Sequence, residues 1–471
     1  MRQALANAIS RPSRPGCVAI LVASLLLALL SHPLIHGDGV AYLVALDSYA
    51  VDGDLDLSNQ VARFAPAIAY PFALSGVTGT PVSPFPFGSA GLLAPLYRIG
   101  GWLEPRVPAL RAYPEHFTPI QGRSLAYSLM VALGAHLYAL ASVALAYRAA
   151  RRVAPGWAAS LAAVCCLAGT PLLYYATVEA LDSHVYGTFA IALALWLAAR
   201  RCPGDREPAG AARASYPWPA ALAIGLSLGL ATLVRWQLLL YALPIGGAVV
   251  WRSAVGGRQA ARTALAFAAG VGVYGGACAL YFWRFFGAPL IVPNTVISGQ
   301  PFIGAPLRYL PQVLLAWHNG WLSWSPIAGL GLAGLVGLAW SRQGAWRALA
   351  LAGLAGVALQ LALNASLDDW YGGWAFGQRR MTEAYPLLVV GLAWLLARDR
   401  RRLVAGAALL CALYGALLLV AQLYYTHTAG HPEGGGIAEV SRWLVSGPHG
   451  PTLAEIFRDR YGPWAWARPE R

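Results

Sequence analysis

Residues 403–424 read LVAGAALLCALYGALLLVAQLY, a stretch without a single charged side chain. A helix rises about 1.5 Å per residue, so about 20 apolar residues in succession can cross the hydrocarbon core of a bilayer. The whole chain has the same character, since 58% of its 471 residues are hydrophobic and only 11% are charged. A soluble domain carries about 25% charged residues. The composition therefore predicts an all-α, polytopic membrane protein.

Similar windows predict about eleven transmembrane helices, within a range of about nine to thirteen. We place them at residues 17–35, 124–147, 156–176, 184–199, 218–234, 236–251, 263–286, 322–340, 346–366, 384–397 and 403–424. The stretch 86–103 is also apolar, but Pro86 and Pro95 interrupt it, which favours a re-entrant or interfacial segment. Gly225 and Gly229 have the spacing used for close helix packing.

The arginines indicate how the chain is oriented in the membrane. All 34 basic residues are Arg, and basic residues near span ends prefer the cytoplasm. Counting spans forward places every Arg cluster between spans on one side, at 148–152, 200–213, 252–262, 342–347 and 398–402. We therefore predict a multi-pass protein of a bacterial cytoplasmic (inner) membrane in three parts. They are a cytoplasmic N-terminus at 1–16, a transmembrane domain at 17–425 with a large outer loop at 36–123, and a short extracytoplasmic tail at 426–471.

Alkaline phosphatase fused after Tyr425 tests this orientation, because that reporter is active only outside the cytoplasm. We expect an active fusion, and an inactive one when the reporter is inserted within the Arg-rich segment 200–213. An inactive fusion after Tyr425 would mean that the orientation is reversed or that the spans are miscounted.

The first outer loop concentrates acid in a chain that is otherwise short of it. Its sequence HGDGVAYLVALDSYAVDGDLD, residues 36–56, holds five aspartates. Asp38 lies just beyond the first span, where a carboxylate is costly unless it is solvated or paired. It either caps a helix that begins near Val40 or serves a function, and Tyr42 falls one helical turn later on the same face. The three acids around Gly53 are typical of a turn and give only a weak metal-binding signal: Asp52, Asp54 and Asp56.

A second outer loop, TVEALDSH at 177–184, places Glu179, Asp182 and His184 within two helical turns of one another. One interpretation is that Asp182 or Ser183 caps the incoming helix. The other is that the acids of this loop hold a substrate.

Arg235 interrupts a long apolar stretch and lies far from the cytoplasmic arginine clusters. It sits at the outer boundary if the stretch forms two helices, and is buried if the stretch forms one bent helix. A guanidinium there either extends to the interface or contacts a phosphate, for which its paired donors are well shaped.

A third outer segment, DDWYGGWAFGQRR at 368–380, ends in two arginines on the face that membrane insertion disfavours for Arg. Its aromatic residues are typical of an interfacial belt. Arg379 and Arg380 are better explained as a clamp for a lipid phosphate. The segment WHNGWLSWS at 317–325, which contains His318, adds a polar and aromatic edge on the same side.

The order of these elements resembles the GT-C superfamily of integral membrane glycosyltransferases. The likeness is greatest to bacterial members related to protein O-mannosyltransferases and aminoarabinose transferases, and it covers residues 17–425. It rests on Gly-Asp-Gly at 37–39, the acidic Ser-His loop at 179–184, Leu-x-Arg at 233–235, His-x-Gly-x-x-x-Trp-Ser-Pro at 318–326 and Trp-x-Gly-Gly-x-x-Phe-Gly-x-Arg at 370–379.

The resemblance implies transfer of a hexosyl or pentosyl group from a polyprenyl-phosphate donor, with inversion, to a hydroxyl or amine on the outer face. The acceptor would be an envelope lipid, polysaccharide or protein, and the resemblance implies no metal, no other cofactor and no nucleic acid. Asp38 would be the general base. The lipid phosphate would be contacted by Arg235, Arg379 and Arg380, and the substrate pocket would be lined by Tyr42, Asp47, Glu179, Asp182, His184 and His318.

A lipid-linked-sugar transporter or flippase is the rival function, because it also needs many spans and buried arginine. Transporters place charges near the bilayer midplane and often contain internal repeats. Here the acids fall in outer loops and the sequence shows no repeat at a fixed period, which favours the enzyme.

Overall fold

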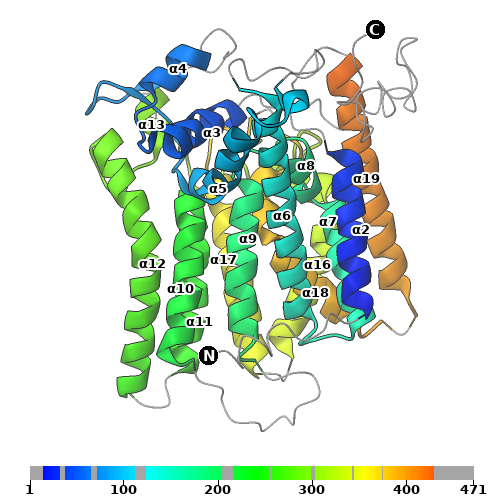
Figure 1. Ribbon diagram of the computed structural model, residues 1–471. Helices are drawn as coiled ribbons and strands as arrows, with labels where there is room; N and C mark the ends of the chain where they lie inside the picture. The colour runs from blue at the N-terminus through cyan, green and yellow to red at the C-terminus, as the bar shows by residue number, and fades with distance from the viewer. Residues whose placement is uncertain are drawn as a thin grey trace.

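The protein is a bundle of long helices with shorter elements gathered at one end (Figure 1). The computed structural model describes residues 14–31, 38–64, 72–111, 123–202, 216–253, 257–298, 303–341, 344–373, 375–399 and 401–428. The predicted N-terminal segment 1–16 and tail 426–471 lie almost entirely outside the described residues. The predicted helical fold class is confirmed.

Each predicted span contains a helix. These helices are α2 (Arg14–Leu30), α6 (Leu125–Ala150), α7 (Gly156–Gly169), α9 (His184–Ala199), α10 (Trp218–Val234), α11 (Leu239–Arg252), α12 (Gly257–Phe286), α16 (Ile327–Trp340), α17 (Gly344–Asn364), α18 (Tyr385–Leu396) and α19 (Leu403–Thr428). Within the described ranges, four stretches are long and apolar enough to cross a membrane: Leu125–Ala150, Gly257–Phe286, Ala345–Asn364 and Leu403–Gln422. The protein is therefore a multi-pass membrane protein, while the count of about eleven spans stays a prediction.

Three predicted spans are divided into two elements in the structure, two of them at a proline. The window 156–176 divides at Pro171 into α7 and the short α8 (Leu172–Thr177). The window 322–340 divides at Pro326 into α15 (Trp321–Trp324) and α16. Proline lacks a backbone N–H, so it is tolerated in the first turn of a helix and ends the one before it. The window 236–251 begins with the 3₁₀ turn η4 (Trp236–Leu238) before α11.

Glycines let α10 and α12 approach closely, as the sequence predicted. A Cβ at Gly225 would lie 2.2 Å from the carbonyl oxygen of Phe267, and one at Gly229 would lie 2.7 Å from that of Val271. No side chain fits at these distances, so the two backbones touch directly.

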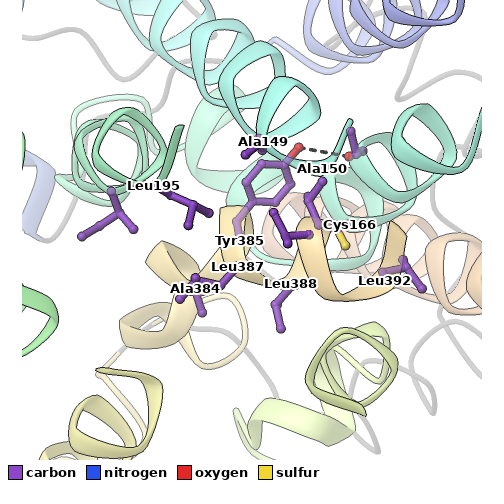
Figure 2. Packing of buried hydrophobic residues seen from close by; sticks show 14 of the residues in the cluster. Ala149, Ala150, Cys166, Leu195, Ala384, Tyr385, Leu387, Leu388 and Leu392 are labelled. Carbon is purple, nitrogen blue, oxygen red and sulfur yellow. Dashed lines mark hydrogen bonds between the residues drawn. The ribbon is translucent and has the colours of Figure 1, made fainter. Parts of the chain in front are cut away.

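Helix α18 lies in the centre of the core (Figure 2). Tyr385, its first residue, is fully buried, and its hydroxyl donates a hydrogen bond to the carbonyl of Ala163 on α7 at 3.0 Å. Leu388 and Leu392 continue the buried surface of this helix. The 3₁₀ helix η5 (Arg379–Ala384) leads directly into α18, so the core packing of α18 fixes the position of η5.

The first loop forms a layer of short elements at one end of the bundle (Figure 1). They are α3 (Asp38–Asp47), the π-helix η1 (Ser48–Asp52), α4 (Ser58–Phe64), a hairpin of β1 (Ala73–Leu74) and β2 (Pro81–Val82), α5 (Gly88–Leu103) and η3 (Pro108–Leu110). The hairpin is antiparallel, with Ala73 opposite Val82. The segment 86–103, predicted as re-entrant or interfacial, forms α5 with Pro95 inside it. The remaining short helices are α13 (Pro293–Ser298) and α14 (Leu310–Leu315).

Candidate active site

Arg379 joins two of the predicted acidic residues. Its Nη2 lies 2.7 Å from Asp38 Oδ2, and its Nη1 lies 3.6 Å from Asp182 Oδ2. Asp38 opens α3, Asp182 lies in the turn before α9, and Arg379 opens η5. The side chain of Asp38 remains 25% exposed, whereas that of Asp182 is 3% exposed. Asp38 is therefore the carboxylate of the two that a substrate can reach.

The glycines of segment 368–380 give Arg379 this position. Gly372, Gly373 and Gly377 have φ angles of +81°, +71° and +62°. Glycine adopts this left-handed region at no steric cost, whereas other residues are strained there. The Gly-Gly and Phe-Gly elements of the motif are thus explained by the turns that direct the chain into η5.

Arg235 lies at the junction between two helices, which selects the two-helix interpretation of its stretch. Helix α10 ends at Val234, and Arg235 is extended, with φ −147° and ψ 112°. Its Nη1 donates to Ser183 Oγ at 2.9 Å and its Nη2 donates to Gln237 Oε1 at 3.1 Å. The Tyr42 hydroxyl also donates to Ser183 Oγ, at 2.7 Å. Tyr42 and Arg235 therefore meet at the loop that carries Asp182.

Glu383 is a member of the site that the sequence analysis missed. Its Oε1 lies 3.1 Å from His184 Nδ1 and 3.4 Å from Arg235 Nε, and its side chain is 1% exposed. The sequence held one signal for Glu383: its carboxylate directly precedes the predicted span 384–397. An acidic side chain at the membrane costs free energy and tends to be functional. We call Asp38, Tyr42, Glu179, Asp182, Ser183, His184, Arg235, Arg379 and Glu383 the polar cluster.

Within the polar cluster, Glu179 is buried and contacts aromatic residues. The Tyr174 hydroxyl donates to Glu179 Oε1 at 3.0 Å. Tyr174 stacks on Phe376 with ring centroids 4.7 Å apart, and the backbone N–H of Phe376 donates to the Tyr175 hydroxyl at 3.2 Å. These contacts join the 177–184 loop to the 368–380 segment, of which Trp374 lies outside the described residues.

Asp47 lies outside the polar cluster. Its two carboxylate oxygens accept hydrogen bonds from Arg123, from Nε at 2.5 Å and from Nη2 at 2.8 Å. The Tyr97 hydroxyl donates to the same carboxylate at 2.7 Å. Asp47 anchors the far end of α3, about 13 Å along the helix from Asp38, and its contact with a substrate stays a prediction.

The two predicted phosphate-clamp arginines of η5 point to different partners, so the structure does not form them into one clamp. Arg380 is buried and pairs with Asp369 of its own segment at 2.5 Å. His318 is exposed, and its ring lies 5.5 Å from that of Tyr371. The phosphate-binding and substrate-binding roles of these residues stay predictions.

The three acids around Gly53 form a turn, as predicted. Gly53 has φ +82°, Asp54 accepts from the Ser48 hydroxyl at 2.8 Å, and Asp56 accepts from the Ser58 hydroxyl at 2.6 Å. Among the residues that the structure describes, no group of three or more His, Cys, Asp or Glu side chains is placed to hold a metal ion. Metal independence of the activity stays a prediction.

Burial changes the acidity of the cluster. It raises the pKa of Glu179 to about 7 and that of Glu383 to about 7. Burial and the neighbouring Glu179 raise the pKa of Asp182 above its usual range. A buried carboxyl group that lacks full charge compensation is more stable when it is neutral.

The protein is therefore expected to be less stable at pH 8 than at pH 5. A carboxyl group whose pKa is higher in the folded protein contributes stability below its unfolded pKa, about 4.3 for Glu, and loses it as pH rises through the folded value. For Glu179 and Glu383 that folded value is about 7. Thermal unfolding of the purified protein in detergent measures the effect. Glu179→Gln should weaken the pH dependence, Glu104→Gln should leave it unchanged, and an equal dependence in all three proteins would contradict the assignment.

The chain matches no family model and no curated protein sequence. Solved structures do share its fold. ArnT from Cupriavidus metallidurans, bound to undecaprenyl phosphate, aligns with 96% of this chain and 76% of its own, with a TM-score of 0.51 and 12% identity. The apo Archaeoglobus fulgidus oligosaccharyltransferase aligns with 96% of this chain and 60% of its own, with a TM-score of 0.52 and 15% identity. The same oligosaccharyltransferase in complex with Zn and sulfate gives a TM-score of 0.51 at 14% identity.

This chain thus spans less than two thirds of the oligosaccharyltransferase and about three quarters of ArnT. At such identities the likeness concerns the fold, and at that level it confirms the resemblance found in the sequence. The chain is a multi-pass membrane protein with the GT-C fold, similar to ArnT and to an archaeal oligosaccharyltransferase.

Proposed function

We propose that the protein is a membrane glycosyltransferase that moves a sugar from a polyprenyl-phosphate donor to an acceptor hydroxyl or amine on the extracytoplasmic face. One observation carries the proposal. Asp38, Asp182 and Arg379 meet within 3.6 Å although they come from three separate segments, and all three segments are predicted to face outward. The GT-C fold shared with a protein bound to undecaprenyl phosphate supports this choice of donor.

The chemistry assigned to the cluster is an inverting displacement. Asp38 accepts the proton of the acceptor group, whose oxygen or nitrogen forms a bond to the anomeric carbon. The bond between that carbon and the phosphate oxygen breaks, and the polyprenyl phosphate leaves with the electron pair. A base must lie within hydrogen-bond reach of the proton it removes, and the partial exposure of Asp38 permits this.

The arginines have a separate role, because the leaving phosphate gains negative charge. A guanidinium offers paired donors to phosphate oxygens, and preorganised positive charge stabilises such a leaving group. We assign this role to Arg379 and Arg235, which contact Asp182 and Ser183 of the same loop. Tyr42, Asp182 and Glu179 are buried in the same polar cluster.

Sugar transfer in liposomes tests the proposal. The purified protein is mixed with undecaprenyl phosphate carrying one of a panel of radiolabelled hexoses and pentoses, and with a bacterial envelope extract as the acceptor. We expect label to move from the donor into the extract, with release of undecaprenyl phosphate, and the transfer to persist in EDTA. Movement of intact donor between leaflets without transfer would instead identify a transporter. Transfer that stops in EDTA and returns with a divalent metal would contradict metal independence.

A further inference from the structure

Glu383 is a buried carboxylate for which the proposed chemistry has no use. It lies in η5, four residues after Arg379, and its side chain is 1% exposed. Unlike Asp38, it is closed to substrate. Its contacts are to His184 and Arg235, so any influence on the reaction passes through these two residues.

The three side chains form a hydrogen-bond chain with one permitted direction. Arg235 Nη1 lies 3.3 Å from His184 Nε2, and a guanidinium can only donate, so Nε2 must accept. The imidazole proton is then on Nδ1, which donates to Glu383 Oε1 at 3.1 Å. The carboxylate therefore fixes the tautomer of His184, and that tautomer presents an acceptor to Arg235.

Packing holds Glu383 in this place. A Cβ at Gly187 of α9 would lie 3.2 Å from Glu383 Cγ, 3.4 Å from its Oε1 and 2.8 Å from Leu238 Cδ1. An alanine at this position would press on both Leu238 and Glu383, so the glycine allows the close packing of α9 against Glu383. Two further atoms of this hydrogen-bond chain, Glu383 Oε2 and Arg235 Nε, are buried without a hydrogen-bond partner among the described residues. A buried polar atom without a partner costs free energy of folding, and proteins retain such atoms where they serve a purpose.

We propose that Glu383 is a positioning residue that, through His184, holds Arg235 in the orientation in which it binds the phosphate of the lipid donor. The inference rests on the proposed function, since it assumes a phosphate-bearing donor. Arg235 is extended at the junction between α10 and η4, outside the regular part of either helix. Its orientation is therefore set by its side-chain partners, which are Ser183, His184, Gln237 and Glu383.

Steady-state kinetics of Glu383→Ala test the role. Without the carboxylate, His184 loses its fixed tautomer and Arg235 loses two partners. We expect the KM for the donor to rise at least tenfold, equivalent to about 1.4 kcal/mol of donor binding, with the acceptor KM unchanged. Loss of folded protein would lower kcat and leave both KM values as they are. Glu104→Gln is the control, and its donor KM should equal that of the wild type.

Two milder variants keep the test valid if Glu383→Ala does not fold. Glu383→Gln retains an oxygen that can accept from His184 Nδ1, so its donor KM should stay within about threefold of the wild type. Gly187→Ala displaces Glu383 without removing it and should raise the donor KM by a smaller factor than Glu383→Ala. An unchanged donor KM in Gly187→Ala would overturn the proposal.

A double-variant cycle with Arg235→Lys gives an independent readout. Residues that act through one another have non-additive effects. Glu383→Ala should therefore add less than twofold to the donor KM once Arg235 is already Lys. Additive effects, or a loss confined to kcat, would overturn the proposal while leaving the glycosyltransferase assignment intact.

Binding of undecaprenyl phosphate to the purified variants separates this proposal from the proposed function. If the wild type binds this lipid and Glu383→Ala binds it at least tenfold more weakly, the positioning role is supported even where no sugar transfer is detected. Equal binding by both proteins, or no binding by the wild type, would overturn it.

Discussion

Replacing Asp38 with Asn is expected to lower the rate of sugar transfer by about 10²–10⁴-fold, the usual contribution of a general base. Asparagine has nearly the same shape, and its amide oxygen can still accept a hydrogen bond from Arg379, which lies 2.7 Å from Asp38 Oδ2. It cannot take up a proton. The loss should therefore fall on kcat, with the KM for the donor little changed, in the liposome assay described above.

Asp52→Asn is the matched control for this variant. Asp52 belongs to the same acidic loop and carries the same charge, but it is exposed and its partners are Asn59 and Gln60. We expect wild-type transfer from it. If Asp38→Asn inserts, keeps its thermal unfolding midpoint and transfers sugar at the wild-type rate, Asp38 is not the base.

The helices were largely predictable because the bilayer imposes one rule on every span. Apolar side chains must face lipid or core, and the backbone must satisfy its own hydrogen bonds, so a helix is required wherever the apolar window is long enough. The bounds of α9 and α10 agree with the predicted windows 184–199 and 218–234. Two predicted windows are divided, at Pro171 and at Pro326, because proline competes there with the hydrophobic pattern.

The site was predictable only in part. Sidedness placed Asp38, Asp182, Arg235 and Arg379 on one face, and the structure brings them together. The sequence ranked Asp38 above Asp47, but no local pattern indicated that Asp47 has a partner of its own. Only the position of Arg123, 76 residues further along the chain, shows that Asp47 is already paired.

Glu383 could not be assigned to the site from the sequence, because its partners are far from it along the chain. Its two partners, His184 and Arg235, lie 199 and 148 residues away in sequence, and no local spacing connects them. Arg380, whose phosphate-binding role stays a prediction, also has a contact that the local pattern did not indicate. It has the residue type and the neighbourhood of a phosphate ligand, yet its guanidinium turns back to Asp369.

Replacing Arg379 with Gln is expected to have the second large effect, on stability as well as on transfer. The guanidinium is 14% exposed and separates Asp38 from Asp182, with Glu179 close behind. Removing one partner of a largely buried ion pair leaves uncompensated charge, which costs about 3 kcal/mol or more. Transfer should also fall sharply, because a cation beside the leaving phosphate is lost.

The loss of stability in Arg379→Gln should depend on pH. This dependence distinguishes a loss of counter-charge from a loss of packing and hydrogen bonds. At pH 5 Glu179, behind Arg379, is largely neutral, since burial raises its pKa to about 7. At pH 8 Glu179 carries charge that Arg379 would compensate, so the unfolding midpoint should fall further below wild type at pH 8 than at pH 5. Arg380→Gln is the control, because Arg380 forms its ion pair with Asp369. Its loss of stability should differ little between the two pH values. If Arg379→Gln loses as much at pH 5 as at pH 8, the guanidinium acts through packing and hydrogen bonds, not as the counter-charge of the acidic cluster.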